Sequence, residues 1–381
     1  MTQDKPNHIL FISDWYPHAD RPFDGIFIQK LAQCIQYQPG WQVSNISFHS
    51  HDKGYLVKEQ VHNGIHEVRL FYPEKAPKLL RHWRMYQMIK EAAERLAATY
   101  GPVQLIQANI MPFAALYAYR LARKWRIPFG IREGYSVYLD DQFLDFPWFK
   151  RKLTRFVAHK SDFLVAISAA LGKALQRHFP KVNPVIIPNP VLREIPKARS
   201  APTTPTLVSI ADFRPYKRLS VLLEAFAKAL EHNPELQLDL YGKGPEEKQL
   251  REQAAALGIA NRVRLLGTVP NATIYERLPG YSFLVISSAV ETFSNVGIEA
   301  LSCGVPVLAT DCGGPADFIT ATNGLLVAPN DAKALTEGIL QMIANSEEYD
   351  RSAIQQAAID RFSMAAVGQQ YVSLYKDAIA R

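Results

Sequence analysis

Short apolar runs with strand character alternate with helical patterns along almost the whole chain. In the first half the runs lie near 7–13, 43–48, 65–71, 103–108, 128–132 and 163–168, and in the second half at 206–212, 236–242, 262–267, 282–288 and 305–310. Consecutive strands separated by a helix must be parallel, because the helix is the crossover that parallel pairing requires. The alternation therefore predicts an α/β protein whose sheets are covered by helices on both faces.

A segment rich in proline, threonine and serine separates the two sets of strands. It occupies residues 187–206 (IPNPVLREIPKARSAPTTPT) and lacks the apolar periodicity of either half. This composition is typical of an interdomain linker. The length of 381 residues also exceeds what one hydrophobic core usually serves. We therefore predict a Rossmann-like domain at 1–186, a linker at 187–206, a second Rossmann-like domain at 207–363 and a terminal helix at 364–381.

Composition narrows the class of protein further. No run of about 18 uncharged apolar residues is present, which argues against a membrane span, and the first residues enter a strand without a signal-peptide pattern. The cysteines Cys34, Cys303 and Cys312 are too few and too scattered for a disulfide framework or a metal site. Cys303, in a Ser-Cys-Gly turn, is interpreted as a small packing residue. We expect a cytoplasmic protein.

Two glutamates, Glu291 and Glu299, stand on either side of a short polar turn. The turn consists of Thr292, Phe293, Ser294 and Asn295. An apolar run at 282–288 predicts a buried strand before it, and NVGIEALSCG after it predicts a short helix that ends at Gly304. The amides of the turn would then lie at a helix N-terminus, which binds anions. We predict a nucleotide-diphosphate site; a capping glutamate and a surface glutamate are the alternative.

The longer segment 286–315, ISSAVETFSNVGIEALSCGVPVLATDCGGP, resembles the donor-site signature of retaining GT-B glycosyltransferases of family 4, the group 1 glycosyl transferases. That family shows a serine, E-G-F, E-A, C-G-x-P-V and T-x-x-G-G in the same order. Thr292 stands where the family usually has glycine, which narrows the donor pocket. The resemblance implies the GT-B fold, with two Rossmann-like domains facing each other across a cleft and a C-terminal helix that crosses back to the first domain.

A second segment, 210–219 (IADFRPYKRL), is similar to the family's G-R-L-x-x-x-K-G, whose arginine and lysine hold the donor diphosphate. Lys217 matches the lysine, whereas Asp212 stands at the usual arginine position. Arg214 lies two residues away and can supply a bidentate guanidinium instead. By this resemblance Lys217 and Arg214 stabilise the diphosphate, Glu291 anchors the transferred sugar and Glu299 accepts bonds from the ribose hydroxyls. The alternative is that both cations only decorate a loop.

Two turns of the second half carry weaker signals. The sequence YGKGPE at 241–246 is the family's G-x-G-P turn, so Gly242 and Lys243 are candidate donor contacts. The sequence GTVP at 267–270 resembles the segment whose backbone meets the base, which makes Val269 a candidate. Each is also explained as an ordinary tight turn.

In the first half, the segment 15–28 (WYPHADRPFDGIFI) is similar to the family's Y-P…P-x-x-G-I-F-V loop. Gly25 lies at the expected helix start, where backbone amides can meet the donor phosphates from across the cleft. His18 is a candidate acceptor contact or a solvated loop histidine. Many relatives have a histidine in an E-H-G turn after the strand at 128–132, but Gly134 stands there in this chain. Arg132 or Glu133 is therefore proposed to contact the transferred sugar.

Charge is unevenly distributed along the chain. Residues 1–190 hold 25 Lys and Arg against 15 Asp and Glu, a net charge of +10, and the remainder hold 18 against 21, a net charge of −3. Basic residues mix with aromatic ones at 78–86 and 148–156, as in amphipathic helices that lie on anionic membranes. A solvated face is the alternative; nucleic acid is disfavoured because no recognition fold accompanies the charge. We expect peripheral contact with the inner face of the cell membrane.

Together these patterns predict a retaining hexosyl- or N-acetylhexosaminyltransferase. It would move a sugar from a nucleotide-diphospho-sugar, most simply a UDP-sugar, to a glycan or a lipid-linked saccharide. We expect this reaction to belong to polysaccharide or lipopolysaccharide synthesis. No cofactor and no metal are expected, because the donor regions lack an Asp-x-Asp motif. A paired-carboxylate hydrolase is disfavoured, since Glu299 belongs on the ribose. Another GT-B enzyme, such as an epimerase, and a catalytically silent sugar-nucleotide binder remain as alternatives, the latter because positions 134, 212 and 292 depart from the family.

Overall fold

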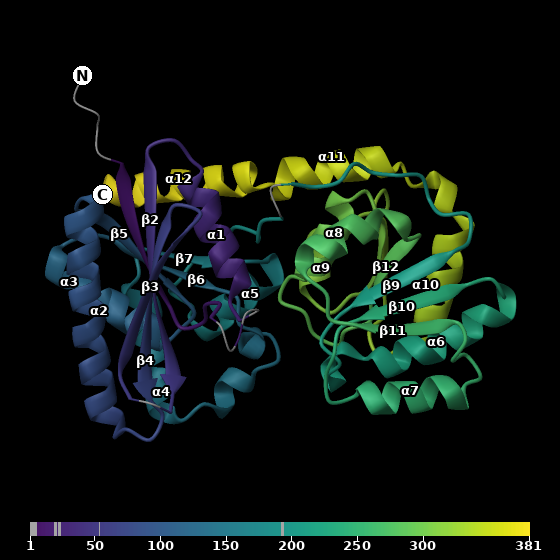
Figure 1. The fold of residues 1–381 in the computed structure, drawn as a ribbon, viewed down its shortest axis with the longest axis horizontal. Coiled ribbons are helices and arrows are strands. Elements are labelled where there is room, and N and C mark those ends of the chain that lie inside the picture. The colour runs from purple at the N-terminus through teal and green to yellow at the C-terminus, as the bar shows by residue number, and fades with distance from the viewer. Residues whose placement is uncertain (1–5, 19–20, 22–23, 53, 192–193) are drawn as a thin grey trace. The chain divides into compact units, whose positions relative to one another are not determined.

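Each half of the chain folds around its own, mostly parallel sheet, as the ribbon in Figure 1 shows. The computed structural model describes residues 6–18, 21, 24–52, 54–191 and 194–381. The first unit comprises Met1–Pro190 with Met364–Arg381, and the second comprises Val191–Ser363. The division after Pro190 falls inside the segment 187–206, for which an interdomain linker is predicted.

The sheet of the first unit has the strand order β3-β4-β2-β1-β5-β6-β7-β8. Its strands are β1 (Asn7–Ser13), β2 (Trp41–His51), β3 (Leu56–His62), β4 (Ile65–Pro73), β5 (Val103–Asn109), β6 (Phe129–Glu133), β7 (Phe163–Ala166) and β8 (Val185–Ile186). Only the pairing of β3 with β4 is antiparallel among these described strands. The order of the parallel strands reverses between β1 and β5, so the ligand-binding switch point of a doubly wound sheet lies at the carboxyl ends of these two strands.

The helices of the first unit follow their strands as crossovers. They are α1 (Ile26–Gln36), α2 (Lys78–Tyr100), α3 (Phe113–Trp125), α4 (Trp148–Lys160) and α5 (Ala169–His178), with short 3₁₀ turns at Ser136–Tyr138 and Gln142–Asp145. The last helix, α12 (Met364–Ile379), packs on α1 and buries Tyr371 and Tyr375 in the core of this unit. The Tyr375 hydroxyl donates to Gln107 Oε1 at 2.7 Å. The prediction that the terminal helix returns to the first domain is confirmed.

The sheet of the second unit is parallel throughout and has the order β11-β10-β9-β12-β13-β14. Its strands are β9 (Thr206–Ile210), β10 (Gln237–Tyr241), β11 (Val263–Gly267), β12 (Phe283–Ile286), β13 (Val307–Thr310) and β14 (Gly324–Val327). Its helices are α6 (Leu219–His232), α7 (Glu247–Ala256), α8 (Asn271–Arg277), α9 (Asn295–Ser302), α10 (Ala332–Ala344) and α11 (Arg351–Phe362), with 3₁₀ turns at Pro215–Lys217, Leu278–Gly280, Gly314–Asp317 and Ser346–Glu348. The strand order reverses between β9 and β12, which places the second switch point there.

The strands β3, β8 and β14 lie outside the predicted runs. Every residue of β3 is exposed, because β3 is an edge strand with no face against the core. Its sequence LVKEQVH therefore has no alternation to detect, and Lys58 and Glu59 are the charges that edge strands commonly carry. β8 has only two residues and β14 only four. The other predicted runs are confirmed, with ends that differ by a few residues.

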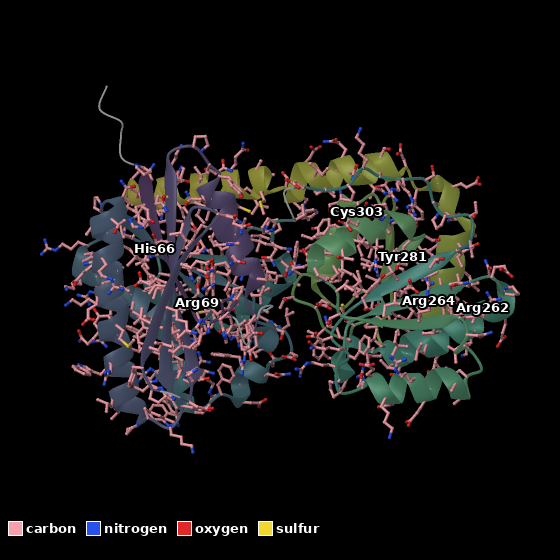
Figure 2. The ribbon with its side chains drawn as sticks, viewed as in Figure 1. His66, Arg69, Arg262, Arg264, Tyr281 and Cys303 are labelled. Atoms are coloured by element: carbon pink, nitrogen blue, oxygen red, sulfur yellow. The ribbon has the colours of Figure 1, made fainter. Side chains whose placement is uncertain are left out.

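A buried carboxylate on β10 shows how the second unit satisfies charge inside its sheet; Figure 2 labels its partners Arg264 and Tyr281. The side chain of Asp239 is 2% exposed and accepts bonds from Arg264 Nε at 2.6 Å and Nη2 at 2.8 Å. The Tyr281 hydroxyl donates to the same carboxylate at 2.7 Å and lies 3.0 Å from the Tyr241 hydroxyl, to which Arg277 donates. Since the network is filled by protein donors, its role is to hold the sheet together.

Candidate functional site

The loops that follow β9 and β12 bring Lys217 and Glu291 together. Lys217 Nζ lies 2.5 Å from Glu291 Oε1, although the two residues are 74 positions apart in the sequence. Ser288 Oγ donates to the same carboxylate oxygen at 2.8 Å. Because β9 and β12 flank the switch point, the pair stands where open α/β sheets bind their ligands. The two residues that the sequence assigned to the sugar and the diphosphate are thus neighbours.

The backbone fixes both members of this pair. The Glu291 amide donates to Cys312 O at 3.0 Å, and its carbonyl accepts from the Gly314 amide at 2.8 Å, so Glu291 is bound to the loop after β13. On the other side, Ser287 Oγ donates to Lys217 O at 2.8 Å. Hydrogen bonds from three strand-end loops therefore hold the carboxylate and the ammonium before any ligand arrives, which limits the reorganisation that binding would need.

Electrostatics keep the Lys217 ammonium charged. Burial alone would lower its pKa, but the Glu291 carboxylate, with smaller contributions from Tyr216 and Asp212, outweighs burial and raises the pKa of Lys217. The side chains of Lys217 and Glu291 remain 18% and 13% exposed. A cation that is partly desolvated and reachable is suited to an anionic ligand. Asp212, which replaces the family's arginine, adds negative charge near this cation.

The turn after Glu291 presents backbone amides at the start of α9. Over the ranges that the structure describes, the amides of Thr292, Phe293 and Ser294 donate to no protein oxygen. Ser294 adopts a left-handed conformation with φ of 75°, and its buried Oγ likewise has no partner within those ranges. Such strain in a non-glycine residue is found where a loop is held for a ligand. The amides and the helix dipole together favour a bound anion.

The side chain of Phe293 serves the core and leaves only its backbone for a ligand. It is 2% exposed and packs edge-on against Phe318, with ring centroids 5.5 Å apart, and against Phe362 at 6.0 Å. The turn is also clamped by Gly314, where an added Cβ would come within 2.3 Å of Phe293 Cα. The second glycine of the C-G-G-P sequence is therefore required for close backbone packing beneath the turn.

A glycine in the turn after β10 also allows two backbone segments to pack closely. Gly242 has φ of +135°, and a Cβ there would lie 1.8 Å from Ala211 O, in the loop after β9. The Phe213 amide donates to Lys243 O at 3.0 Å and ties the two loops together. Lys243 is exposed and Val269 is partly exposed. The assignment of Gly242, Lys243 and Val269 as donor contacts stays a prediction.

Glu299 lies on α9 with its side chain turned inward. It is 4% exposed, and Asn271 Nδ2 lies 3.3 and 3.4 Å from its two carboxylate oxygens. Asn271, at the start of α8, was not singled out from the sequence, since nothing local links it to Glu299. The pair joins the loop after β11 to α9. Binding of a ribose by Glu299 stays a prediction.

The cations next to Lys217 differ in their surroundings. Arg214 is exposed, and its amide donates to Asp212 O at 2.8 Å. Arg218 stands at the glycine of the K-G motif, with φ of 52°. Its Nε donates to Asn330 Oδ1 at 2.8 Å. Glycine adopts this left-handed conformation without strain, which explains why the family has glycine here. The hydrogen bond to Asn330 offsets part of the strain that an arginine has at this position. Phosphate binding by Arg214 stays a prediction.

Comparison with known proteins gives this site a family. Residues 192–359, nearly the whole second unit, match the model of the glycosyl transferases group 1. The match covers residues 192–359 alone, so it says what the second unit is similar to.

Two curated relatives and one solved structure illustrate the likeness. An exopolysaccharide phosphotransferase of Streptomyces coelicolor is 31% identical over 228 residues, which are 58% of this chain and 24% of that protein. The N-acetyl-α-D-glucosaminyl L-malate synthase of Bacillus anthracis is 28% identical over 176 residues, 45% of each protein. The match therefore spans less than half the length of these relatives. The structure of Anabaena HepE with UDP and glucose superposes with a TM-score of 0.74 at 18% identity, covering 97% of this chain and 100% of that one. This likeness shows the GT-B fold.

The first unit holds the remaining predicted residues. Gly25 precedes α1, as expected, with φ of 67°, and a Cβ there would come within 2.6 Å of the Trp15 backbone. His18 lies in the loop after β1, its ring 4.5 Å from that of His49, and lines a cavity of about 480 Å³. Residues 19–20 and 22–23 of the predicted loop motif lie outside the described residues. The roles of Gly25 with phosphate and His18 with the acceptor stay predictions.

Arg132 and Glu133, proposed for the missing histidine, are buried in protein contacts. Arg132 is 1% exposed, bonds to Asn189 and lies over the Phe27 ring at 4.6 Å. Glu133 is fully buried and accepts from the amides of Met111, Gly134 and Tyr135 at 2.8 to 3.0 Å. Burial raises the pKa of Glu133 even though these amides lower it. Their assignment as sugar contacts stays a prediction that this burial does not support.

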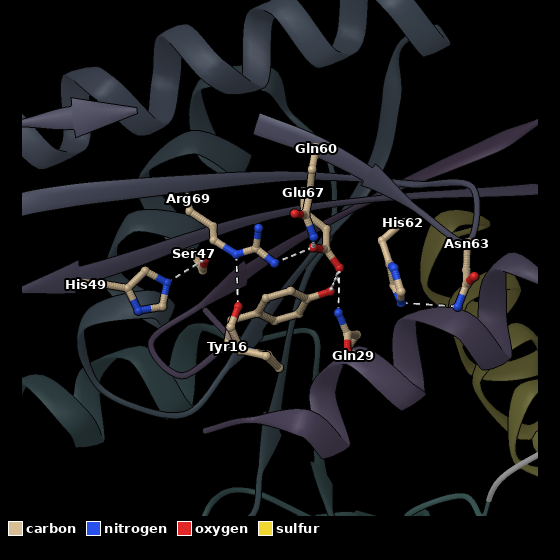
Figure 3. Close-up of polar contacts among 10 residues, drawn as sticks. Tyr16, Gln29, Ser47, His49, Gln60, His62, Asn63, Glu67 and Arg69 are labelled. Atoms are coloured by element: carbon tan, nitrogen blue, oxygen red, sulfur yellow. Dashed lines mark hydrogen bonds and ion pairs between the residues drawn. The ribbon is translucent and has the colours of Figure 1, made fainter. Parts of the chain in front are cut away.

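A carboxylate that sequence reasoning missed anchors the loop after β1, as the close-up in Figure 3 shows. Glu67, on β4, is fully buried and accepts from the Tyr16 hydroxyl at 2.8 Å, Gln29 at 2.9 Å, Gln60 at 2.7 Å and Arg69 at 2.6 Å. Arg69 Nε also donates to Pro17 O at 2.9 Å. These bonds hold Tyr16 and Pro17 onto the sheet. No local pattern signals them, because the donors come from four separate elements.

The remaining predictions concern metal ligands and membrane spans. Within the described ranges, no group of three or more His, Cys, Asp or Glu side chains could hold a metal ion. No described helix is both long and apolar enough to cross a membrane. The need for a metal or cofactor stays untested by these findings.

Proposed function

We propose that this chain transfers a glycosyl group, with retention of configuration, from a nucleoside-diphospho-sugar to a saccharide hydroxyl. The observation that carries the proposal is the Lys217–Glu291 pair beside the open amides of Thr292, Phe293 and Ser294, at the switch point of the second sheet. An ammonium and several amides suit a diphosphate, and a carboxylate suits sugar hydroxyls. The three kinds of group occur together at one sheet edge.

In the reaction we propose, the bond from the anomeric carbon to the diphosphate breaks while a bond to the acceptor oxygen forms on the same face. The departing phosphate oxygen takes the proton of the acceptor hydroxyl. Lys217 and the amides after Glu291 would stabilise the negative charge that grows on the diphosphate, and these interactions strengthen in the transition state. Glu291 would hold the sugar hydroxyls and favour the positive charge that develops at the anomeric carbon.

UDP is the nucleotide we propose first. The HepE protein, which shares this fold, was solved with UDP and glucose. The match of the second unit to the group 1 glycosyl transferases supports a nucleotide-sugar donor in general. A hexose or N-acetylhexosamine as the transferred sugar is the corresponding proposal.

The surface of the first unit supports an acceptor carried by a lipid, as in cell-surface polysaccharide or lipopolysaccharide synthesis. The first turns of α2 and α4 expose large apolar side chains: Leu79 by 88%, Trp148 by 70% and Trp83 by 58%. Basic residues stand between them, namely Lys78, Arg81, Arg84, Lys150, Arg151, Lys152 and Arg155. Apolar side chains interleaved with cations complement the interface of an anionic membrane. Peripheral attachment to such a membrane is part of the proposal.

The test begins with a panel of UDP-, GDP- and ADP-sugars in a thermal-shift assay, since a ligand that binds the native state raises the unfolding temperature. The panel is followed by an assay of free sugar and nucleotide release with the donor that binds. A transferase hydrolyses that donor slowly, whereas a silent binder releases nothing. An epimerase would release an epimer of the donor sugar.

Glu291→Gln sharpens this assay. We expect turnover to fall by about 100-fold or more, because an interaction made in the transition state is lost, while donor affinity changes much less. Glu231→Gln, an exposed glutamate on α6, is the matched control and should leave turnover unchanged. Turnover of Glu291→Gln at the wild-type rate would refute the assignment.

A further inference from the structure

The switch point of the first sheet carries a carboxylate to which no role has been assigned. Asp14 follows β1 directly, and its amide donates to Asn109 O, at the end of β5, at 3.4 Å. It therefore stands between the two strands where the order of the sheet reverses, the place where a doubly wound sheet binds its ligand. Asp14 lies in the loop after the first strand of its sheet, and Lys217 lies in the corresponding loop of the second unit.

Asp14 lies at the junction of two cavities. One has a volume of about 480 Å³ and is lined by Asp14 with Tyr16, His18, Phe48, His49 and Tyr72 among others. The other has a volume of about 60 Å³ and is lined by Asp14 with His82 and Tyr117 among others. All of these residues belong to the first unit. The larger cavity falls in the range of small-molecule sites, which run from about 300 to 1,000 Å³.

Within the ranges that the structure describes, no protein group donates a hydrogen bond to the Asp14 carboxylate, and no cation lies within ion-pair distance of it. Glu67, in the same unit, shows the opposite condition, because four donors saturate its carboxylate. Protein carboxylates that are removed from water are normally hydrogen-bonded. Asp14 is partly exposed, so water in the open cavity, or a ligand that replaces this water, supplies the donors that the protein does not.

The charge around Asp14 is consistent with this reading. Burial raises the pKa of Asp14 to about 6, and Lys150 on α4 acts in the opposite direction. The other titratable groups that face it are Tyr72, Tyr117 and Tyr135, together with Arg81 and His82 on α2 beside the smaller cavity. At neutral pH Asp14 is therefore mostly an ionised hydrogen-bond acceptor.

The rest of the larger cavity favours an uncharged, hydroxyl-rich ligand. Burial lowers the pKa of His49 to about 3, with further contributions from His18, Arg69 and Arg21, so its imidazole is neutral. Phe48 and Tyr72 add aromatic surface of the kind on which sugar rings rest. The described lining also holds Arg21 and the carboxylates of Asp24, Asp52 and Glu74. Acidic groups therefore outnumber the arginine and, with the neutral imidazole and the aromatic faces, suit saccharide hydroxyls better than a phosphate.

We propose that Asp14 binds a hydroxyl of the saccharide acceptor in this cavity. The carboxylate accepts the hydroxyl's hydrogen bond and orients its oxygen; no bond to Asp14 forms or breaks, and in transfer the proton leaves with the diphosphate. The identification of this saccharide as the acceptor rests on the proposed function. It names the class of ligand, a neutral saccharide, and the residue that holds it.

The experiment compares the full-length wild type with Asp14→Asn, and uses Glu91→Gln, an exposed glutamate on α2, as the matched control. The probes are the methyl glycosides of glucose, galactose, mannose and N-acetylglucosamine, titrated by calorimetry at pH 7.5 in the presence of UDP. We expect at least one glycoside to bind the wild type and to bind Asp14→Asn about tenfold more weakly or worse, because a bond to a charged acceptor is lost. The Glu91→Gln variant should bind like the wild type.

A pH series separates binding by the carboxylate from a merely structural effect. Because the pKa of Asp14 is about 6, the affinity of the wild type for the glycoside should fall about tenfold between pH 7.5 and pH 5, whereas Asp14→Asn should show no such dependence. Equal affinities of Asp14→Asn and the wild type, or a wild type that binds none of the four glycosides, would overturn the proposal.

UDP binding, followed by thermal shift, keeps this result distinct from the proposed function. We expect Asp14→Asn to bind UDP like the wild type, which also shows that this variant is folded. If Asp14→Asn does not fold, Asp14→Ser is used in its place. Failure of the wild type to bind any nucleotide would count against the proposed donor site. Glycoside binding that depends on Asp14 would still establish the saccharide site.

Discussion

The parallel strands of the two sheets are ordered alike around their switch points, but the two switch points carry different chemistry. After β9 and β12, a cation and a carboxylate stand 2.5 Å apart beside open amides. After β1, the carboxylate of Asp14 faces a cavity without a protein donor in the described ranges. Topology thus indicates where a ligand would lie, and the first polar residues after the strands carry the chemistry that we propose for it: a diphosphate in one unit and saccharide hydroxyls in the other.

The largest effect we expect follows from removing the cation at the second switch point. Lys217→Met keeps the apolar stem but leaves Glu291 without its ammonium and the diphosphate without its partner. UDP affinity should fall by about 100-fold or more, since a charged hydrogen-bonded contact in a partly buried site is lost. Titration calorimetry measures this. Lys228→Met, an exposed lysine on α6, is the control, and UDP affinity that is equal in both variants would break the comparison.

A second effect concerns the frame that holds the loop after β1. In Glu67→Gln one acceptor oxygen becomes an amide that points at donors, including Arg69, so several buried groups lose their partner at once. We expect the free energy of unfolding to fall by about 2–4 kcal/mol, measured by urea denaturation. Glu59→Gln is the matched change on neighbouring β3, where Glu59 pairs with Arg95 at the surface. That variant should lose less than about 1 kcal/mol.

The comparison also shows what could be predicted from the sequence. Lys217, Glu291 and the amide turn were found because each belongs to a contiguous motif beside a strand of recognisable pattern. Glu67 could not be found in this way, because its donors come from separate elements and meet only in the folded sheet. Asp14 did leave a signal: it is the first acidic residue after the first strand of a doubly wound sheet. Applying the switch-point rule to both halves would have identified it.

Arg132 and Glu133 show the limit of arguing from sequence position. They are the last two residues of β6, close to the position where a sugar contact is expected, but the side chains at a strand end can point into the protein as well as out of it. Glu133 accepts from three backbone amides, so it closes the turn in which the family's histidine usually stands. Sequence position alone does not say whether a polar side chain satisfies the backbone or meets a ligand.

A smaller effect is expected on stability at the first switch point. The pKa of Asp14 is raised to about 6 from an ordinary value of 3.8, so the folded state binds its proton more tightly than the unfolded state does. Its ionisation therefore costs stability, and this cost develops as pH rises from about 4 through 6. Asp14→Asn should raise the free energy of unfolding by about 1–3 kcal/mol at pH 7.5 and change it little at pH 4. Urea denaturation at both pH values measures this, and a destabilised variant at pH 7.5 would show that the carboxylate serves the fold.

The smallest effect concerns the membrane surface that borders the same switch point. Arg81 and His82 on α2 line the smaller cavity with Asp14, and Lys150 on α4 acts on the Asp14 charge, so both exposed turns lie beside the saccharide cavity. A lipid anchor held by these turns would leave its saccharide within reach of Asp14. Co-sedimentation with phosphatidylglycerol vesicles should fall severalfold in the double variant Trp83→Ser, Trp148→Ser, because each exposed indole contributes interfacial area.

Salt and lipid composition complete that measurement. Binding should weaken when the salt concentration is raised, since each basic residue near the surface contributes about 1 kcal/mol that screening removes. Leu257→Ser, an exposed leucine at the end of α7 in the second unit, should bind vesicles like the wild type. Equal binding to phosphatidylcholine and phosphatidylglycerol would mean that the cations on α2 and α4 do not face a membrane. The acceptor would then have to be recognised through the Asp14 cavity alone, and a soluble saccharide would replace the lipid-linked one.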